Sequence, residues 1–367
     1  MKLDHSTNGS NEDFPCPARR AARVTRWAIL IVVSAALLAV GCGQPNQPPQ
    51  DSGESQVLEI RLALQPNPAN KAWEASNLFK QELEKRSQGQ VKVLLYDSAT
   101  LGDERQVIEA CYLGVIEMVQ FTSSKASSLD PAFNLLDMPF LFVDEEHHRR
   151  VLNGPIGQEL LDGLRRYRLQ GLAFYDCGFR NMFNSVGRAI RRPEDLAGLK
   201  VRVMTSPVMV DSINALGASA TPLSASELFQ ALKTGVVDAA ENNPQVFVSD
   251  KYYEAGAMNF SWTRHFSNQH VLVANRKWLD ELAESHPHLE RLIREVARDI
   301  IPEYNRRWKA AIDAALKVFE EKGVKSNQIE DVQPFIEKVA PVYEGFFRRY
   351  PQVDRTLVDR IRKEAAR

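Results

Sequence analysis

The sequence predicts an α/β fold built in two lobes, and three observations support this prediction. Segments that alternate between apolar and polar residues, as strands do, are followed by segments with apolar residues at helical spacing. This strand, helix, strand, helix order implies right-handed crossovers and a largely parallel sheet covered by helices. The chain has 367 residues, 44% of them hydrophobic and 25% charged, so it is long enough for two lobes with cores of their own.

The first part of the chain supplies two predicted strands and a helix between them. Residues 57–64 (VLEIRLAL) alternate and predict a strand, and residues 91–96 predict the next. Between them, residues 69–87 carry apolar residues with charges interspersed, which is typical of an amphipathic helix.

Residues 119–124 are a candidate wall of a ligand cleft. They come at the C-terminal end of a predicted strand, and ligands of open α/β sheets bind beyond these ends. Phe121 in this segment is therefore either a cleft residue or a core residue, and its residue type does not decide between the two.

The N-terminus predicts export. Residues 27–41 form an uncharged run that is short for a membrane span but suits a signal peptide. Small residues before Cys42 suit a bacterial lipoprotein leader, in which this cysteine is lipidated and becomes the first mature residue; an uncleaved anchor helix is the alternative. We expect residues 1–41 to be the leader and residues 42–56, rich in Pro, Gln, Gly and Ser, to be a tether.

The middle of the chain contains an arginine in an unusual place. Residues 171–175 predict a short strand that carries the chain into the second lobe, and Val201 and Val203 then alternate with polar residues in another strand. Arg202 lies in the middle of that strand, with no acid near it along the strand. A guanidinium keeps its proton and offers five donors, so either the fold or a ligand must supply an acid.

The last part of the chain predicts one more strand and a long helix. Residues 270–274 alternate as a strand, and residues 289–322 have apolar residues at helical spacing. Pro302 lies within this helix and should kink it or split it in two. A basic amphipathic tail over residues 346–367 ends the chain.

Several classes of function are disfavoured by what the sequence lacks. The net charge is −1, and no stripe of lysine or arginine outside the N-terminus suits nucleic acid. The chain has no GxSxG, P-loop, GxGxxG after a strand or HExxH motif. We therefore expect no enzyme and no cofactor.

Histidines and cysteines give weak signals for a metal or a disulfide. The pairs His147-His148 and His286/His288 lie in charged stretches that we expect to be exposed, and we expect no metal site there. Cys111 falls on a predicted helix and Cys177 beside the candidate site, so we expect two buried thiols rather than a disulfide.

Residues 178–244 resemble, in order, the solute-binding proteins of TRAP transporters (tripartite ATP-independent periplasmic transporters), the DctP-like family. The family pattern PEDLxGLKxRV matches residues 193–203, a GA and a TP follow at residues 217–218 and 221–222, and ELxxALxxGVVDxxEN matches residues 227–242. Residues 101–118 resemble a further family segment, with Glu117 in place of the usual aspartate.

The resemblance implies a periplasmic protein of two lobes with a hinge and a long connecting helix. It places lobe 1 at residues 57–176 with roughly 266–300, and lobe 2 at residues 177–265 with roughly 301–345. The lobes would close over an organic acid and hand it to the TRAP membrane permease. A two-lobed sensor for the same ligand, reporting to a membrane signalling partner, is the alternative.

The resemblance also assigns roles to site residues. The arginine that matches Arg202 holds the ligand's carboxylate, because a planar guanidinium meets both oxygens at once. Arg180 resembles a second family arginine that reaches the ligand, with a solvated surface arginine as the alternative. Asn242 matches a family asparagine, its neighbour Asn243 is an equal candidate, and Phe183 lies close enough in sequence to shape the pocket.

The arginines imply a carboxylate ligand, and the family serves C4-dicarboxylates, 2-oxo acids, sugar acids and sialic acid. The run Glu241-Asn242-Asn243 resembles members that bind hexuronates, which favours a hexuronate or another sugar acid.

Overall fold

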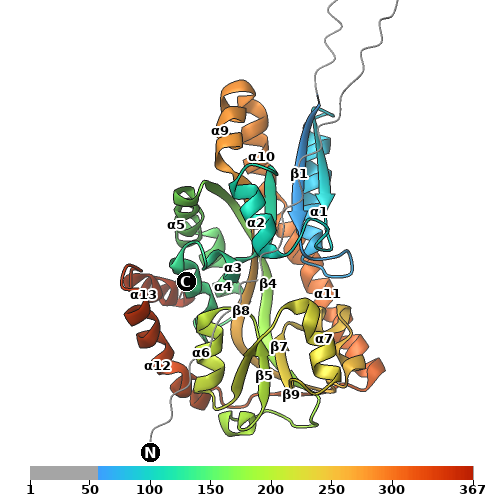
Figure 1. Cartoon of the computed structure of the whole chain (residues 1–367), viewed down its shortest axis with the longest axis vertical. Coiled ribbons are helices and arrows are strands. Elements are labelled where there is room, and N and C mark those ends of the chain that lie inside the picture. Colours follow the sequence, from blue (N-terminus) through green and yellow to red (C-terminus); the bar gives the residue numbers. More distant parts are fainter. Residues whose placement is uncertain (1–56, 367) are drawn as a thin grey trace, which may run out of the picture. The chain divides into compact units, whose positions relative to one another are not determined.

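Two long antiparallel strands, β4 (Leu169–Asn184) and β8 (Asn259–Asn275), form the centre of the fold (Figure 1). The computed structural model describes residues 57–366, which belong to one compact unit. The predicted leader, lipidation site and tether lie outside the described residues. Every residue of β4 is buried, because the sheet continues on both sides of it and helices cover its faces.

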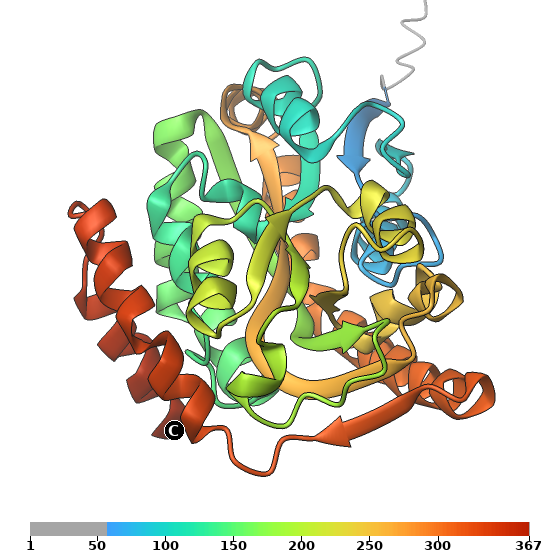
Figure 2. The same cartoon turned by 60° about the horizontal axis from the view of Figure 1, so that its bottom comes forward.

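The remaining strands attach to this pair in two groups. The strand order is β2-β1-β3-β8-β4-β7-β5-β6, with β9 on β8. The first group is β1 (Leu58–Leu64), β2 (Val91–Tyr96) and β3 (Met118–Thr122), and the second is β5 (Lys200–Val203), β6 (Ser219–Pro222), β7 (Ala239–Asn242) and β9 (Lys325–Gln328). In Figure 2, β9 (orange-red) lies along the lower edge and leads to the helices at the C-terminus.

The predicted parallel pairing holds within each group, since β1 pairs in parallel with β2 and β3, and β5 with β6 and β7. The expectation of a largely parallel sheet is wrong for the centre of the sheet. There β8 runs antiparallel to β3 and β4, and β4 runs antiparallel to β7. The sheet is therefore mixed, and the α/β fold class is confirmed.

The two groups attach to different halves of the long strands. β3 pairs with residues 270–274 of β8, whereas β9 pairs with residues 259–262 of β8 and β7 with residues 181–184 of β4. The pairing of β4 with β8 shifts register between Asp176 and Phe179, where Gly178 has φ +67°. The predicted lobe limit at residue 176 lies beside this irregularity, and the limits themselves stay predictions.

Helices fill the connections between strands and cover the sheet. The α-helices are α1 (Trp73–Arg86), α2 (Glu104–Tyr112), α3 (Ser123–Ala126), α4 (Glu145–Asn153), α5 (Pro155–Gly163), α6 (Pro207–Ala215), α7 (Ala225–Lys233), α8 (Pro244–Ser249), α9 (Arg276–Ser285), α10 (Pro287–Asp299), α11 (Ile301–Lys322), α12 (Gln333–Arg349) and α13 (Thr356–Lys363). Short 3-10 helices are η1 (Pro131–Asp137), η2 (Leu164–Tyr167), η3 (Pro193–Leu196), η4 (Tyr252–Ala255) and η5 (Glu364–Ala366). Among residues 57–366, no helix combines the length and the apolar character needed to cross a membrane.

The prediction for Pro302 is confirmed. The long helical segment breaks at Ile300, between α10 and α11, and Pro302 lies in the first turn of α11. In the first turn the proline costs little, because the N–H that it lacks would have no partner within the helix.

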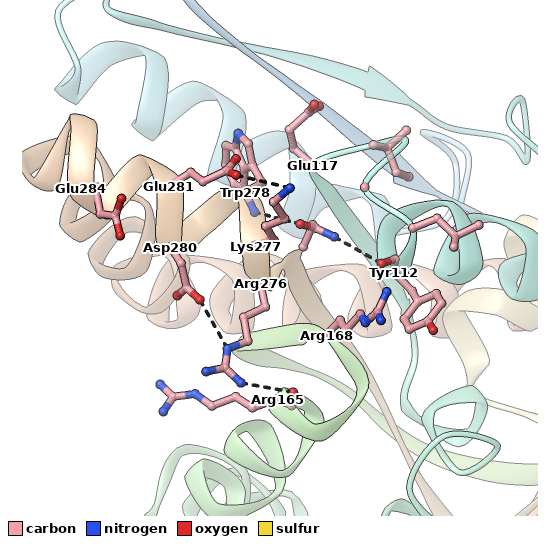
Figure 3. A pocket seen from close by; sticks show the side chains of 14 residues that line it. Tyr112, Glu117, Arg165, Arg168, Arg276, Lys277, Trp278, Asp280, Glu281 and Glu284 are labelled. Carbon is pink, nitrogen blue, oxygen red and sulfur yellow. Dashed lines mark hydrogen bonds and ion pairs between the residues drawn. The ribbon is translucent and has the colours of Figure 1, made fainter.

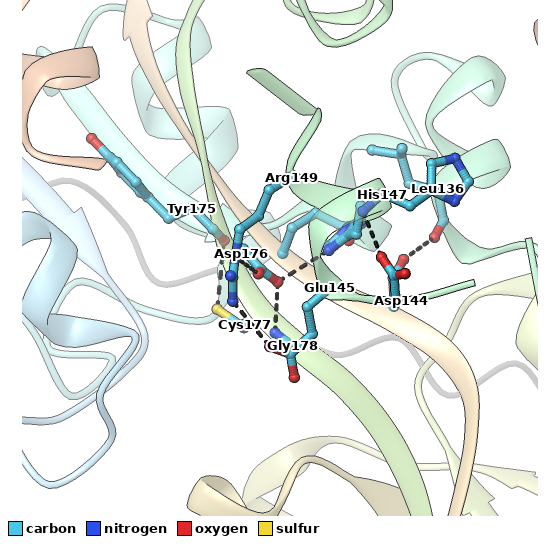
Figure 4. A network of polar contacts seen from close by, with 12 residues as sticks. Leu136, Asp144, Glu145, His147, Arg149, Tyr175, Asp176, Cys177 and Gly178 are labelled. Carbon is cyan, nitrogen blue, oxygen red and sulfur yellow. Dashed lines mark hydrogen bonds and ion pairs between the residues drawn. The ribbon is translucent and has the colours of Figure 1, made fainter. Parts of the chain in front are cut away.

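A buried polar network holds the irregular point of β4 (Figure 4). The carboxylate of Asp176 accepts from the backbone N–H of Gly178 at 2.7 Å, from His148 Nδ1 at 3.0 Å and from Arg149 Nε at 2.7 Å. Burial alone would raise the pKa of Asp176, but these donors and charges outweigh it and lower that pKa. The network ties α4 to the point where β4 passes from one strand group to the other.

The expected exposure of His147 and His148 is wrong, because both side chains are fully buried. They share the inward face of α4 with Val151 and Leu152, which follow at helical spacing, while the charges of the segment lie on the other face. Cys111 and Cys177 are buried free thiols, as predicted.

Two further buried histidines predict how stability changes with pH. Burial, with a smaller effect of the Arg180 charge, lowers the pKa of His265 to about 3 and that of His270 to about 4. Both imidazoles are therefore neutral in the folded protein, whereas the unfolded chain takes up protons below pH ~6.5. The stability that they contribute is present above pH ~6.5 and is lost as the pH falls toward 4.

We expect each of these histidines to lower the free energy of unfolding by about 2 kcal/mol between pH 7 and pH 5. The variant His265→Gln should therefore lose less stability than the wild type over this range in urea unfolding. His286→Gln, at an exposed position, is the control and should keep the wild-type pH dependence. Equal pH dependence in the wild type and His265→Gln would contradict the argument.

Candidate functional site

The strands β4, β7 and β5 lie next to one another and carry the predicted polar site residues. Arg180 is in β4, Arg202 in β5 and Asn242 at the end of β7. The register pairs Asn181 with Asn242 and Arg202 with Ala240. Arg180, Arg202 and Asn242, which are 22 to 62 residues apart in the sequence, therefore lie on neighbouring strands of the sheet.

Arg202 is a buried cation without an acid partner. It is 3% exposed, and its Nε and Nη2 both donate to the carbonyl oxygen of Leu223, at 3.0 and 2.7 Å. No carboxylate among the described residues forms an ion pair with it. Burial lowers the pKa of Arg202, an effect that Glu241 opposes and Arg180 reinforces. Among the described residues, the fold therefore provides no carboxylate as an ion-pair partner for the Arg202 guanidinium.

Arg180 is also buried, but it is paired. Its Nε and Nη2 donate to the carboxylate of Glu241, and Nη2 donates in addition to the Glu241 carbonyl oxygen at 2.9 Å. At 3% exposure it is not a solvated surface arginine. Its Nη1 makes no hydrogen bond with residues 57–366. This nitrogen is therefore available as a hydrogen-bond donor.

Glu241 is a site residue that the sequence analysis missed. It is fully buried and neutralises Arg180 across the β4–β7 pairing. The sequence could have indicated this role, because Glu241 is the only charged residue of the strand AAEN and a buried carboxylate needs a cation beside it.

The two asparagines end β7 and begin α8. Asn242 Oδ1 accepts from the Asn243 backbone N–H at 2.9 Å, and Asn243 Oδ1 caps α8 by accepting from the Val246 N–H at 2.8 Å. The Asn243 side-chain nitrogen is buried and has no partner in the described part of the chain. An unpaired buried donor of this kind is costly unless something else accepts its hydrogen bond.

The structure places both predicted phenylalanines in apolar surroundings. Phe121 is fully buried in the core cluster that also contains Val119 and Phe133. Phe183 is fully buried, stacks on Tyr252 with ring centroids 5.3 Å apart, and meets Phe247 edge-on at 5.1 Å. Roles for these two rings in ligand binding stay predictions.

Asp137 is a second missed residue, and it lies near enough to Arg180 for that charge to act on it. Its two carboxylate oxygens accept from Ser124 Oγ at 2.7 Å and from Ser206 Oγ at 2.9 Å. Burial raises the pKa of Asp137 to about 6, with the hydroxyl donors and then Arg180 acting against burial. Ser124 follows β3 and Ser206 follows β5, so this carboxylate joins the two strand groups.

A cavity of about 620 Å³ lies elsewhere, between α9 and the residues that follow α2 (Figure 3). Its charged residues pair largely with one another: Arg276 with Asp280 at 3.4 Å and Lys277 with Glu281 at 3.5 Å. None of the polar site residues predicted from the sequence lines it.

Comparison with known proteins is consistent with this geometry. The family described as bacterial extracellular solute-binding protein, family 7, matches residues 65–350. A solute-binding protein of Chromohalobacter salexigens is 33% identical over 293 residues, which cover 80% of this chain and 84% of that protein.

Two solved structures of TRAP periplasmic solute-binding proteins have the same fold. One, from Chromohalobacter salexigens with bound D-glucuronate, is 31% identical with a TM-score of 0.78, covering 83% of this chain and 99% of the other. The second, from Xanthobacter autotrophicus Py2 with bound β-D-galacturonate, is 33% identical with a TM-score of 0.75, covering 84% and 99%. The resemblance of residues 178–244 is thereby confirmed, and the chain belongs to the DctP family, the family 7 solute-binding proteins of TRAP transporters.

Proposed function

We propose that this protein captures a sugar acid with one carboxylate, of the hexuronate class, and delivers it to a TRAP permease. The observation that carries the proposal is the buried, unpaired guanidinium of Arg202. A ligand carboxylate would supply the missing acid and meet the guanidinium fork with charge-assisted hydrogen bonds. Such a pair offsets the cost of desolvation when its geometry is good and its other donors are satisfied.

The charge balance of the site favours one carboxylate over two. Arg180 is already neutralised by Glu241, which leaves one uncompensated cation between these two arginines. The second carboxylate of a C4-dicarboxylate would have to share that cation or remain without one. The free Nη1 of Arg180 and the side-chain nitrogen of Asn243 are donors that suit hydroxyl and ring oxygens of a sugar acid.

The ligands bound in two of the similar structures belong to this class. Two proteins about 30% identical to this chain hold D-glucuronate and β-D-galacturonate. Both ligands are hexuronates, with one carboxylate and several hydroxyls. We infer binding and release without chemical change of the ligand, in keeping with the non-catalytic role of the family.

The proposal for the N-terminus rests on the sequence alone. Residues 1–41 would direct export, and a lipid on Cys42 would hold the mature protein at the membrane through the tether. Retention near the membrane would raise the local concentration of the protein at its permease.

Thermal or urea unfolding against a ligand panel tests the substrate class. D-glucuronate or D-galacturonate at a hundred times its Kd should raise the free energy of unfolding by about 2.7 kcal/mol. D-Glucose, which has the same ring without the carboxylate, is the control and should give no shift. Stabilisation by succinate and by neither uronate would overturn the hexuronate class, and no response to any acid would overturn carboxylate binding.

Substitution of Arg202 tests the residue that carries the proposal. Arg202→Ala should weaken uronate binding at least about thirtyfold, because truncation of one partner of a buried charge pair costs about 2–5 kcal/mol. Arg202→Lys should restore little, since an ammonium cannot match the two carboxylate oxygens in the same plane.

The control for this experiment is Arg191→Ala, at an exposed position close in sequence, which should bind normally in isothermal titration calorimetry. Cooperative urea unfolding of Arg202→Ala would show that the fold is intact. Normal uronate binding by that variant would remove Arg202 from the site.

A further inference from the structure

Gln245 joins the two strand groups through its side-chain amide. It is the second residue of α8 and is 6% exposed. Its Oε1 accepts from the backbone N–H of Lys71 at 3.1 Å, and its Nε2 donates to the carbonyl oxygen of Ala69 at 3.0 Å. One side chain therefore pairs with a donor and an acceptor two residues apart, as a neighbouring strand would.

The two partners belong to opposite groups of the fold. α8 is anchored by Val246 and Phe247 in the aromatic cluster around Phe183. Ala69 and Lys71 lie between β1 and α1, which belong to the first strand group. The contact is therefore made or lost when the two groups move relative to each other.

The segment that meets Gln245 is held in shape by its own contacts. Asn67 Oδ1 accepts from the backbone N–H groups of Ala69 and Asn70, at 2.9 and 3.2 Å. Just beyond the segment, Trp73 Nε1 donates to Asp97 Oδ2 at 2.8 Å. The Lys71 donor and the Ala69 acceptor are thus presented in a fixed arrangement, which lowers the entropy lost when Gln245 binds them.

We propose that Gln245 is a positioning residue that latches the two groups together over the bound acid and so sets its rate of release. It follows the site residues Asn242 and Asn243 on the same segment, and both its polar atoms are engaged by the opposite group. It acts on the ligand through the closed arrangement, and this inference rests on the proposed function.

Other contacts between the groups are less suited to this role. Lys125 Nζ donates to Thr205 Oγ1 at 2.8 Å, but that contact is exposed to solvent. Asp137, which contacts Ser124 and Ser206, also feels the charges of Arg180 and Glu241, so a substitution there would change the electrostatics of the proposed site as well. Gln245 is neutral and buried, and it both accepts and donates a hydrogen bond. Its substitution by methionine therefore changes the contact between the groups without changing the charge of the proposed site.

The contacts of Gln245, which are present in the ligand-free structure, must break before the two groups can separate, so they slow ligand release more than they speed association. Gln245→Met keeps the length of the side chain and removes both hydrogen bonds. Gln245→Glu keeps an acceptor for Lys71 but places a carboxylate oxygen against the Ala69 carbonyl. Each should raise the release rate constant of D-glucuronate about tenfold in stopped-flow fluorescence, with the association rate constant within about twofold of the wild type.

Gln81→Ala is the matched control, because Gln81 lies on the exposed face of α1 and makes its contact within that helix. It should leave both rate constants unchanged. An unchanged release rate in Gln245→Met and Gln245→Glu would overturn the proposal.

A second measurement needs no ligand and separates the latch from the proposed function. In the ligand-free full chain, residue-resolved hydrogen exchange should show a protected Lys71 amide in the wild type and in Gln81→Ala, with protection reduced at least tenfold in Gln245→Met. Equal protection of Lys71 in the wild type and Gln245→Met would overturn the latch. If the wild type failed to bind D-glucuronate, the hexuronate proposal would fail, and exchange at Lys71 would still decide whether Gln245 joins the two groups.

Discussion

Burying a guanidinium is far more costly than burying a neutral side chain, and this fold buries two of them on strands that flank β7. The two guanidinium groups differ in their hydrogen-bond partners. Arg180 receives a carboxylate and a carbonyl from Glu241, whereas Arg202 receives a single carbonyl, from Leu223. The difference between a compensated and an uncompensated cation defines the site, and the rest of the structure keeps both in place.

The two long strands connect the two strand groups and hold the candidate site residues in place. β4 and β8 pass through both strand groups, so the groups share one sheet, and the strands β5 and β7, which carry candidate site residues, attach at one end of it. The Asp176 network fixes the irregular turn of β4 beside Gly178, two residues before Arg180. Asp137 and Gln245 then contribute contacts that run from one group to the other.

Local patterns in the sequence were enough to predict the strands near residues 57–64 and 91–96, the break at Pro302 and the position of Arg202 within a strand. These features depend on alternation, helical spacing and the chemistry of proline, all of which act over a few residues. The burial of His147 and His148 was missed because charged neighbours dominate the segment, while the apolar residues that share their face come one turn later. The pairing of Arg180 with Glu241 joins positions 61 residues apart, and no local pattern specifies which acid meets which cation. For the same reason, the antiparallel centre of the sheet could not be inferred from strand order alone.

A site with one uncompensated buried cation selects ligands by charge as well as by shape. A neutral sugar would leave Arg202 buried and unpaired, so the cost already present in the free protein would remain. A dianion would bring a second charge into surroundings where Glu241 already holds Arg180. A monoanion with many hydroxyls compensates Arg202 and offers acceptors to donors that are otherwise unused, including the buried nitrogen of Asn243. In the proposed site, the free protein holds one guanidinium without an ion-pair partner, and a ligand carboxylate that paired with it would supply binding energy.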